Sequence, residues 1–119
     1  MNHNQKLGHH GEQLAEDELI KEGYLILEQH YLKRVGEIDL IAFDQKEKEI
    51  VFVEVKTRRT DTFGYPEEAV TGKKLAKLEK AALSWLEENK KIDNPWRIDI
   101  MSVEIGREVK ITHLENVTI

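Results

Sequence analysis

The sequence of 119 residues contains no cysteine, and this absence excludes several kinds of site. Without thiols the chain has neither a disulfide framework nor a cysteine-based zinc site, and thiol chemistry is excluded as well. A metal ion would have to bind oxygen or imidazole ligands. The adjacent His9 and His10 have no third ligand at a suitable spacing, so we interpret them as solvated side chains.

Long hydrophobic runs are also absent. No window approaches the roughly 18 apolar residues of a membrane-spanning helix, and residues 1–17 show no basic segment followed by an apolar run. We therefore expect a cytoplasmic protein that makes no membrane contact. The two prolines, Pro66 and Pro95, stand between periodic segments, and the chain has no repeat and no linker rich in proline, glycine or serine. Residues 1–119 are expected to form a single domain.

An excess of positive charge is missing too, because the formal net charge is −5. This balance is not typical of proteins that coat nucleic acid through bulk positive charge. The basic residues are nevertheless clustered, in KTRR at residues 56–59 and at Lys73 and Lys74. An acidic metal site flanked by basic patches would also carry a negative total charge.

Apolar periodicity predicts two helices. Between about residues 8 and 22, apolar side chains recur at helical spacing, and Gly23 follows at a position that favours a helix end. From residue 71 to about residue 89 a second stripe is formed by Leu75, Leu78, Ala82, Trp85 and Leu86. Thr71 is a good N-cap for this second helix.

Alternating or strongly apolar segments predict strands at residues 24–32, 35–43, 50–56 and 96–104, with a further edge strand at 109–114. The order is thus helix, three strands, helix, and one or two strands. This order indicates an α/β fold, an α+β mixed sheet with helices packed on it.

The loop at residues 44–49 sets the register of the central hairpin. If this loop closes symmetrically, Phe43 pairs with Ile50, and Asp39 then lies opposite Glu54 on one face. Directly opposed side chains have Cβ atoms about 5 Å apart, so two carboxylates there would repel each other. A hard divalent cation, Mg²⁺ or Mn²⁺, would remove this repulsion.

In the same register Lys56 lies opposite Glu37 and two residues beyond Glu54. A lysine there suits the orientation or activation of an attacking water and offsets charge on a phosphate. The alternative is that Asp39 and Glu54 are edge carboxylates in surface salt bridges with Lys56 and Arg58. The triplet EVK alone favours this alternative, because such short motifs are common.

The context of the hairpin resembles a known fold. Five stretches occur in order between about residues 8 and 104: GHHGEQLAEDEL, GEIDLIAFD, IVFVEVKTRR, FGYPEEAVTGKKLAKLEKAA and WRIDIMSVEI. The pattern resembles the PD-(D/E)xK restriction-endonuclease-like fold, whose core is helix, three strands, helix, strand. In detail it is similar to the YraN family, small bacterial proteins thought to be nuclease-like. Ile38 stands where the superfamily motif has a proline, a position that varies widely.

The resemblance implies metal ligation by Asp39, Glu54 and Val55, and a catalytic role for Lys56. It also implies a supporting acid at Glu12, as in similar Holliday-junction resolvases. Glu12 borders the buried stripe of the first helix, which would bring it over the sheet. A first-turn acid favoured by the helix dipole is an equally good interpretation.

Five basic residues are expected to contact nucleic acid: Lys56, Arg58, Arg59, Lys73 and Lys74. Lys73 and Lys74 fall in the first turn of the second helix, where the dipole disfavours cations unless a phosphate is bound. Lys74 also matches the lysine of the family's VTxxK stretch. The alternative is that both lysines are simply solvated.

We therefore expect a Mg²⁺- or Mn²⁺-dependent endonuclease acting on DNA, with branched or structured DNA as substrate by analogy to the resolvases. The alternative is a non-catalytic nucleic-acid-binding module that acts through a partner. A scaffold protein would need a large exposed apolar patch, which this polar sequence does not predict. A homodimer would fit a two-stranded substrate.

Four side chains receive structural interpretations. Arg97 and Asp99 share one face of a late strand, as a salt bridge beside the site or as a structural pair, and we favour the structural pair. Trp85 lies on the apolar stripe of the second helix, so we expect Trp85 and Trp96 in the core and not stacked on bases.

Overall fold

Helices and strands follow one another in the order that the sequence predicts. The computed structural model describes residues 1–60 and 71–117, so residues 63–70 of the family-like stretch, including Pro66, lie outside the described residues. The elements are α1 (His3–Lys21), β1 (Tyr24–Lys33), β2 (Gly36–Asp44), β3 (Glu49–Arg59), α2 (Gly72–Glu88), β4 (Trp96–Ile105) and β5 (Val109–Leu114).

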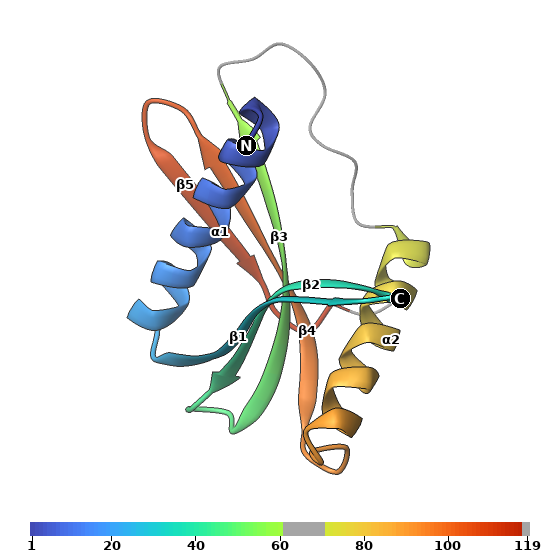
Figure 1. The fold of residues 1–119 in the computed structure, drawn as a ribbon. Helices are drawn as coiled ribbons and strands as arrows, with labels where there is room; N and C mark the ends of the chain where they lie inside the picture. The colour runs from blue at the N-terminus through green and yellow to red at the C-terminus, as the bar shows by residue number, and fades with distance from the viewer. Residues whose placement is uncertain (61–70, 118–119) are drawn as a thin grey trace.

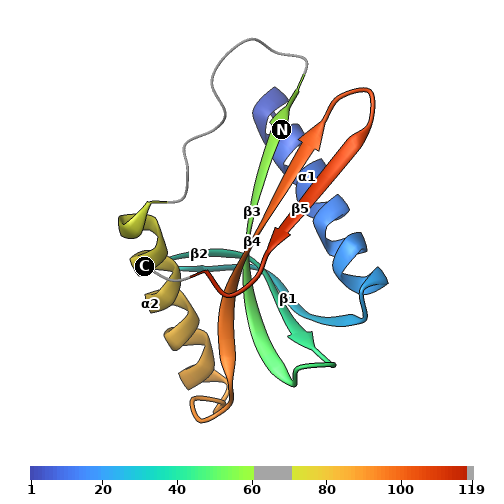
Figure 2. The ribbon, with the colours of Figure 1, turned by 180° about the vertical axis from the view of Figure 1, so that it is seen from behind.

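The strands form one five-stranded sheet in the order β1-β2-β3-β4-β5. All neighbours are antiparallel except β3 and β4, which are parallel and are joined through α2. The two helices lie on opposite faces of the sheet (Figures 1 and 2). The predicted mixed α/β architecture is confirmed, with β5 as the additional edge strand. Neither described helix is long and apolar enough to cross a membrane.

Helix α1 begins about five residues earlier than predicted, at His3. Its start is set by a capping box, in which the Asn2 side chain accepts the Gln5 backbone N–H at 2.8 Å and the Gln5 side chain accepts the Asn2 N–H at 2.9 Å. The first turns are polar and exposed, so apolar periodicity could not reveal them. For α2 the predicted N-cap is confirmed, because the Thr71 hydroxyl accepts the Lys74 N–H at 3.2 Å.

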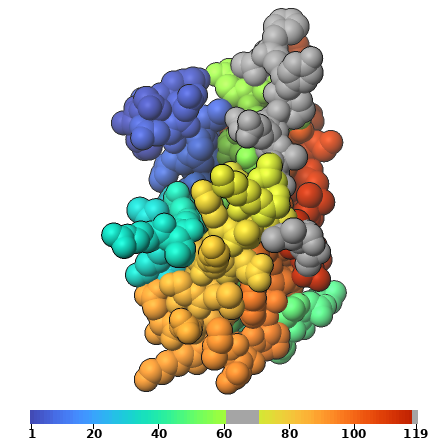
Figure 3. Space-filling model, turned by 90° about the vertical axis from the view of Figure 1, so that its right-hand side faces the viewer, coloured from blue at the N-terminus to red at the C-terminus, as the bar shows by residue number. Residues whose placement is uncertain are grey.

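Each face of the sheet carries its own apolar core. Under α2 the rings of Trp85 and Trp96 meet Phe52 edge-on, each with ring centroids 5.8 Å apart. Trp85 is in the core as predicted, and the partly buried Trp96 packs against it. Figure 3 shows α2, in yellow and orange, covering the middle and lower part of this side. Under α1 the core includes Ala15, Leu19, Val51, Val53 and Met101.

The predicted hairpin register is confirmed over the pairs from Asp44 with Glu49 to Leu40 with Val53, including Phe43 with Ile50. The ladder between β2 and β3 ends there among the described residues. Asp39 and Glu54 come next. The predicted register made them a further pair, but no backbone pair joins them in the structure. Instead, the Asp39 carboxylate accepts the backbone N–H of Val55 at 2.7 Å.

Helix α1 packs closely against β3 at Gly11. A Cβ added there would overlap the Thr57 side chain on β3, with the Thr57 Cβ only 2.7 Å away. A β-branched side chain within a strand has little freedom to move aside. Gly11 therefore fixes the height of α1 over β3, and with it the position of the next residue, Glu12.

Gly11→Ala is expected to lower the free energy of unfolding by about 1–3 kcal/mol, because the added methyl group forces α1 away from β3. Gly8→Ala on the same helix is the matched control, since a Cβ there meets nothing within 4 Å. That control should stabilise the protein by roughly 0.5–1 kcal/mol, through the helix propensity of alanine. Urea denaturation of both variants checks the prediction, and equal effects at the two positions would contradict the close contact.

Candidate functional site

The two predicted metal-binding acids are both buried at the point where β2 and β3 separate. Asp39 and Glu54 are each 9% exposed. Asp39 is held by its hydrogen bond from the Val55 N–H, so this carboxylate takes the place of a rung in the backbone ladder. Burial of two acids this close together is costly unless positive charge accompanies them.

Burial raises the pKa of Asp39 from 3.8 to about 8, and the charges of Glu54 and Glu12 raise it as well. The hydrogen bond from Val55 opposes this rise without cancelling it. Burial also raises the pKa of Glu54, although the charges of Lys74 and Lys56 favour its ionised form. The interactions of Asp39 with Glu54 and Glu12 show that the structure brings together the three acids singled out in the sequence.

Lys74 supplies positive charge next to this pair. The N-terminus of α2 places its Nζ 3.3 Å from Glu54 Oε1. Burial lowers the pKa of Lys74, but the charge of Glu54, the hydrogen bond to Glu54 and the charge of Asp39 act together against this effect, and the pKa is raised. Lys74 was expected to contact phosphate, and the structure instead places it directly on a predicted metal ligand. Lys56, half-buried near the end of β3, also interacts with Glu54 through its charge.

Glu12 lies on the sheet-facing side of α1, as its place beside the buried stripe predicted. Its side chain is 20% exposed, and its Oε2 lies 2.9 Å from Nε2 of His30 on β1. Burial raises the pKa of Glu12, whereas the charge of His30 lowers it. His30 also approaches Glu37, whose Oε1 lies 3.8 Å from Nδ1. His30 was not predicted from the sequence, and Glu37 was expected opposite Lys56.

The other predicted site residues differ from one another in their contacts and their exposure. Arg58 is engaged in an ion pair with Glu104 on β4, with Nη2 and Oε1 2.6 Å apart. Arg59 is exposed at the end of β3, and Lys73 is exposed in the first turn of α2. Val55 contributes its N–H to Asp39, while its side chain belongs to the core under α1.

Asp39→Asn should melt at or above the wild type in EDTA, because the amide keeps an acceptor for the Val55 N–H and removes the repulsion. An acid whose pKa rises on folding stabilises the folded state most below its unfolded pKa. This contribution is lost as the pH rises from about 4 to about 8. The advantage of Asp39→Asn over the wild type should therefore grow between about pH 6 and about pH 8.5.

Thermal melts in EDTA at these two pH values, repeated across a Mn²⁺ titration, test this expectation. An ion that binds only the folded state stabilises it by about 2.7 kcal/mol at roughly 100 times Kd, and Asp39→Asn should lose most of that gain. Glu54→Gln serves as the paired variant at the other carboxylate. Amide variants that are less stable than the wild type in EDTA, with no Mn²⁺ effect on the wild type, would contradict a shared metal site.

Comparison with known proteins gives relatives over almost the whole chain. Residues 11–103 match the uncharacterised protein family UPF0102. A UPF0102 protein of Syntrophomonas wolfei is 46% identical over 115 residues, which cover 95% of this chain and 97% of the relative. A UPF0102 protein of Trichlorobacter lovleyi is 43% identical, with coverage of 95% and 90%. The corresponding protein of Geobacter metallireducens is 44% identical, with coverage of 96% and 93%.

Proposed function

The chain belongs to the UPF0102 family, and we propose that it is a Mg²⁺- or Mn²⁺-dependent endonuclease that hydrolyses phosphodiester bonds of DNA. The proposal includes membership of the YraN group within the PD-(D/E)xK nucleases, and a cytoplasmic location. The observation that carries it is the burial of Asp39 and Glu54 beside Lys74 and Lys56, where two strands separate. A purely structural salt bridge requires one acid and one base. It would not require a second buried acid whose pKa is raised.

Asp39 and Glu54 would hold the divalent ion, because hard cations prefer carboxylate oxygens. Two buried acids with raised pKa values fit such an ion, since they lack enough compensating positive charge. When bound, a divalent cation polarises phosphate oxygens and lowers the pKa of a water ligand. The backbone of Val55 would provide a further ligand for this ion.

The lysines and Glu12 provide the remaining functions. Lys56 would orient the attacking water and offset charge that develops on the phosphate. Lys74 lies at the N-terminus of α2, where backbone N–H groups and a cation together favour a phosphate. Its contact with Glu54 would then be exchanged for one with the substrate. Glu12 would act through its interaction with Asp39 as a supporting acid.

The second candidate is a DNA-binding module of the same fold that does not cleave and acts through a partner. The exposed positions of Arg59 and Lys73 favour it, because basic side chains at the surface suit contacts with phosphates. The ion pair between Arg58 and Glu104 argues against it, because it leaves less positive charge for DNA binding. The two candidates differ in whether the bound substrate is turned over.

Cleavage of labelled single-stranded, duplex, flap and four-way DNA in Mg²⁺, Mn²⁺ or EDTA tests the proposal. We expect metal-dependent cleavage, strongest on branched DNA and increasing toward about pH 8, with Glu54→Gln as the inactive control. DNA binding without cleavage on every substrate would favour the second candidate. Cleavage that survives Glu54→Gln would remove the proposed site, and the mass of the complex on four-way DNA would test the expected homodimer.

A further inference from the structure

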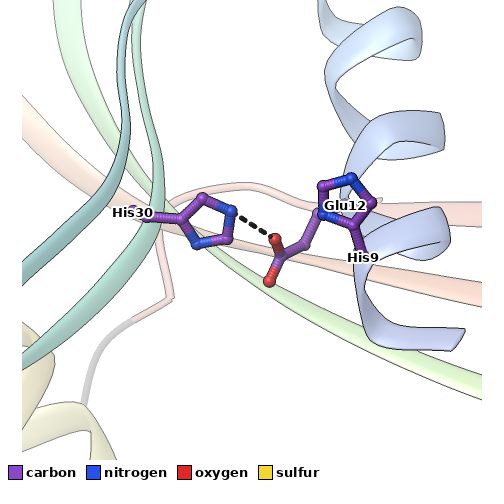
Figure 4. Close-up of side chains that lie close together, drawn as sticks. All are labelled: His9, Glu12 and His30. Atoms are coloured by element: carbon purple, nitrogen blue, oxygen red, sulfur yellow. Dashed lines mark ion pairs between the residues drawn. The ribbon is translucent and has the colours of Figure 1, made fainter. Parts of the chain in front are cut away.

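Three side chains beside the proposed centre form a group of their own: His9, Glu12 and His30. One ligand atom from each lies within 4.8 Å of the other two. His9 and Glu12 stand three residues apart on α1 and therefore share a helix face, and His30 reaches toward them from β1 (Figure 4). The sequence near His9 offers no third ligand at a suitable spacing, and the fold supplies one from β1.

A small cavity of about 30 Å³ lies at this group. It is lined by the three side chains together with Gln13, Glu16, Gln29 and Leu40. This volume is close to that occupied by one water molecule in the liquid, so the cavity suits a single small ion. Six of these seven lining residues carry a polar or charged group, which an apolar packing defect would not explain.

Within this group one carboxylate oxygen of Glu12 lacks a hydrogen bond. Its Oε2 is buried and makes no hydrogen bond, although His30 Nε2 lies only 2.9 Å away. A buried carboxylate oxygen without a hydrogen-bond donor is costly. A cation bound between the imidazoles and the carboxylate would satisfy this oxygen directly.

The backbone at His30 is the third sign of a built site. Among the described residues four non-glycine residues have positive φ, and His30, with φ of 50°, is the one that lies inside a strand. A left-handed residue in a strand costs free energy and persists only where its surroundings hold it there. The flanking pairs, Gln29 with Leu40 and Tyr31 with Ile38, hold His30 in this conformation and direct it toward α1.

We propose that His9, Glu12 and His30 bind one first-row transition-metal ion, with Zn²⁺ as the expected occupant. Two imidazoles and one carboxylate form a ligand set that suits Zn²⁺ and Co²⁺, whereas Mg²⁺ and Ca²⁺ prefer oxygen ligands alone. Three protein ligands leave a fourth position for water. The site shares Glu12 with the proposed nuclease centre, but it requires neither Asp39 nor Glu54 and does not rest on nuclease activity.

A second group with suitable ligand atoms, Asp99, His113 and Glu115, is a weaker candidate. Both oxygens of Asp99 already accept hydrogen bonds from Arg97, and the Asn116 N–H donates to one of them. A metal ion there would have to displace a buried guanidinium. The group at His30 contains instead an acceptor that still lacks a donor.

The experiment is a titration of the full, untagged chain with Co²⁺, followed by visible absorption, and with Zn²⁺, followed by calorimetry. We expect one ion per chain and at least about 100-fold weaker binding in His9→Asn and His30→Asn, since loss of an outer-shell partner alone costs roughly 10- to 100-fold. Asparagine tolerates a left-handed backbone, so His30→Asn should retain the fold. His10→Asn, the adjacent histidine outside the group, is the matched control and should bind as the wild type.

Two further arms separate this proposal from the nuclease. Asp39→Asn and Glu54→Gln should still bind Zn²⁺, and excess Mg²⁺ should not displace it. Unchanged binding in His9→Asn and His30→Asn, or an equal loss in His10→Asn, would overturn the proposal. Loss of Zn²⁺ in Asp39→Asn with retention in His30→Asn would also overturn it, by placing the ion at the carboxylate pair.

Discussion

Glu54→Gln and Asp39→Asn are each expected to reduce the rate of DNA cleavage at least about 1000-fold, and Lys56→Met roughly 100- to 1000-fold. Loss of a group that stabilises only the transition state lowers kcat, and single electrostatic contacts of this kind are worth roughly 100- to 1000-fold. Loss of a metal ligand should cost more, because the ion leaves with it. DNA affinity measured in Ca²⁺ should change by no more than about tenfold for Lys56→Met. Single-turnover cleavage with Mn²⁺ measures the chemical step.

A matched pair of lysine variants tests the role of α2 in this reaction. Lys74→Met should weaken cleavage and DNA binding, because Lys74 contacts Glu54 at the N-terminus of the helix. Lys73→Met removes the same charge from the exposed neighbouring position and should have much less effect. Equal effects of the two variants would mean that only the local positive charge matters, and that Lys74 has no specific place in the site.

Arg97→Met is expected to lower the free energy of unfolding by about 3–5 kcal/mol, the usual cost of breaking a buried ion pair on one side. The Arg97 side chain is 5% exposed, and its Nε donates to the fully buried Asp99 at 2.9 Å. The guanidinium also donates to four other side chains: Tyr24, Asp44, Glu49 and Glu115. Its removal would leave Asp99 and Asp44 without their principal buried cation.

Arg58→Met is the control for this prediction, because it breaks an ion pair between partly exposed side chains. Exposed pairs are worth about 0–1 kcal/mol, so this variant should be close to the wild type in stability. Urea denaturation at neutral pH compares the two. Similar losses in both variants would show that Arg97 contributes only as an ordinary surface charge, contrary to its burial.

The central hairpin could be predicted because its determinants are local. A polar loop between two strongly apolar segments leaves few ways to close, and the pairing of Phe43 with Ile50 followed from symmetry alone. The same symmetry predicted a ladder that continues to Asp39 and Glu54. In the structure the Asp39 side chain, and not a backbone carbonyl, accepts the next N–H of β3, and no signal in the sequence predicts this change. Thr71 was identified for an equally local reason, its preference for the N-cap position.

The contacts that the sequence did not reveal join segments far apart in the chain. The position of His30 depends on the register of β1 against β2, which shifts between Ile26 and Glu28 at an irregularity with no recognisable signal in the sequence. The contact of Lys74 with Glu54 depends on the path from β3 to α2. Arg97 and Asp99 were correctly paired, but side chains drawn from four other segments complete their network.

The parallel pairing of β3 and β4 has a consequence for the order in which the protein folds. Strands β1, β2 and β3 form two consecutive hairpins. The pairing of β3 with β4 instead places Ile50 beside Trp96, with the whole α2 crossover between them in the sequence. Contacts between residues distant in sequence form slowly, because closing the intervening loop costs entropy first. The three-stranded meander, with Asp39 and Glu54, should therefore assemble before α2 delivers Lys74. The nascent chain would pass through a state in which Asp39 and Glu54 are already adjacent but Lys74 does not yet contact Glu54.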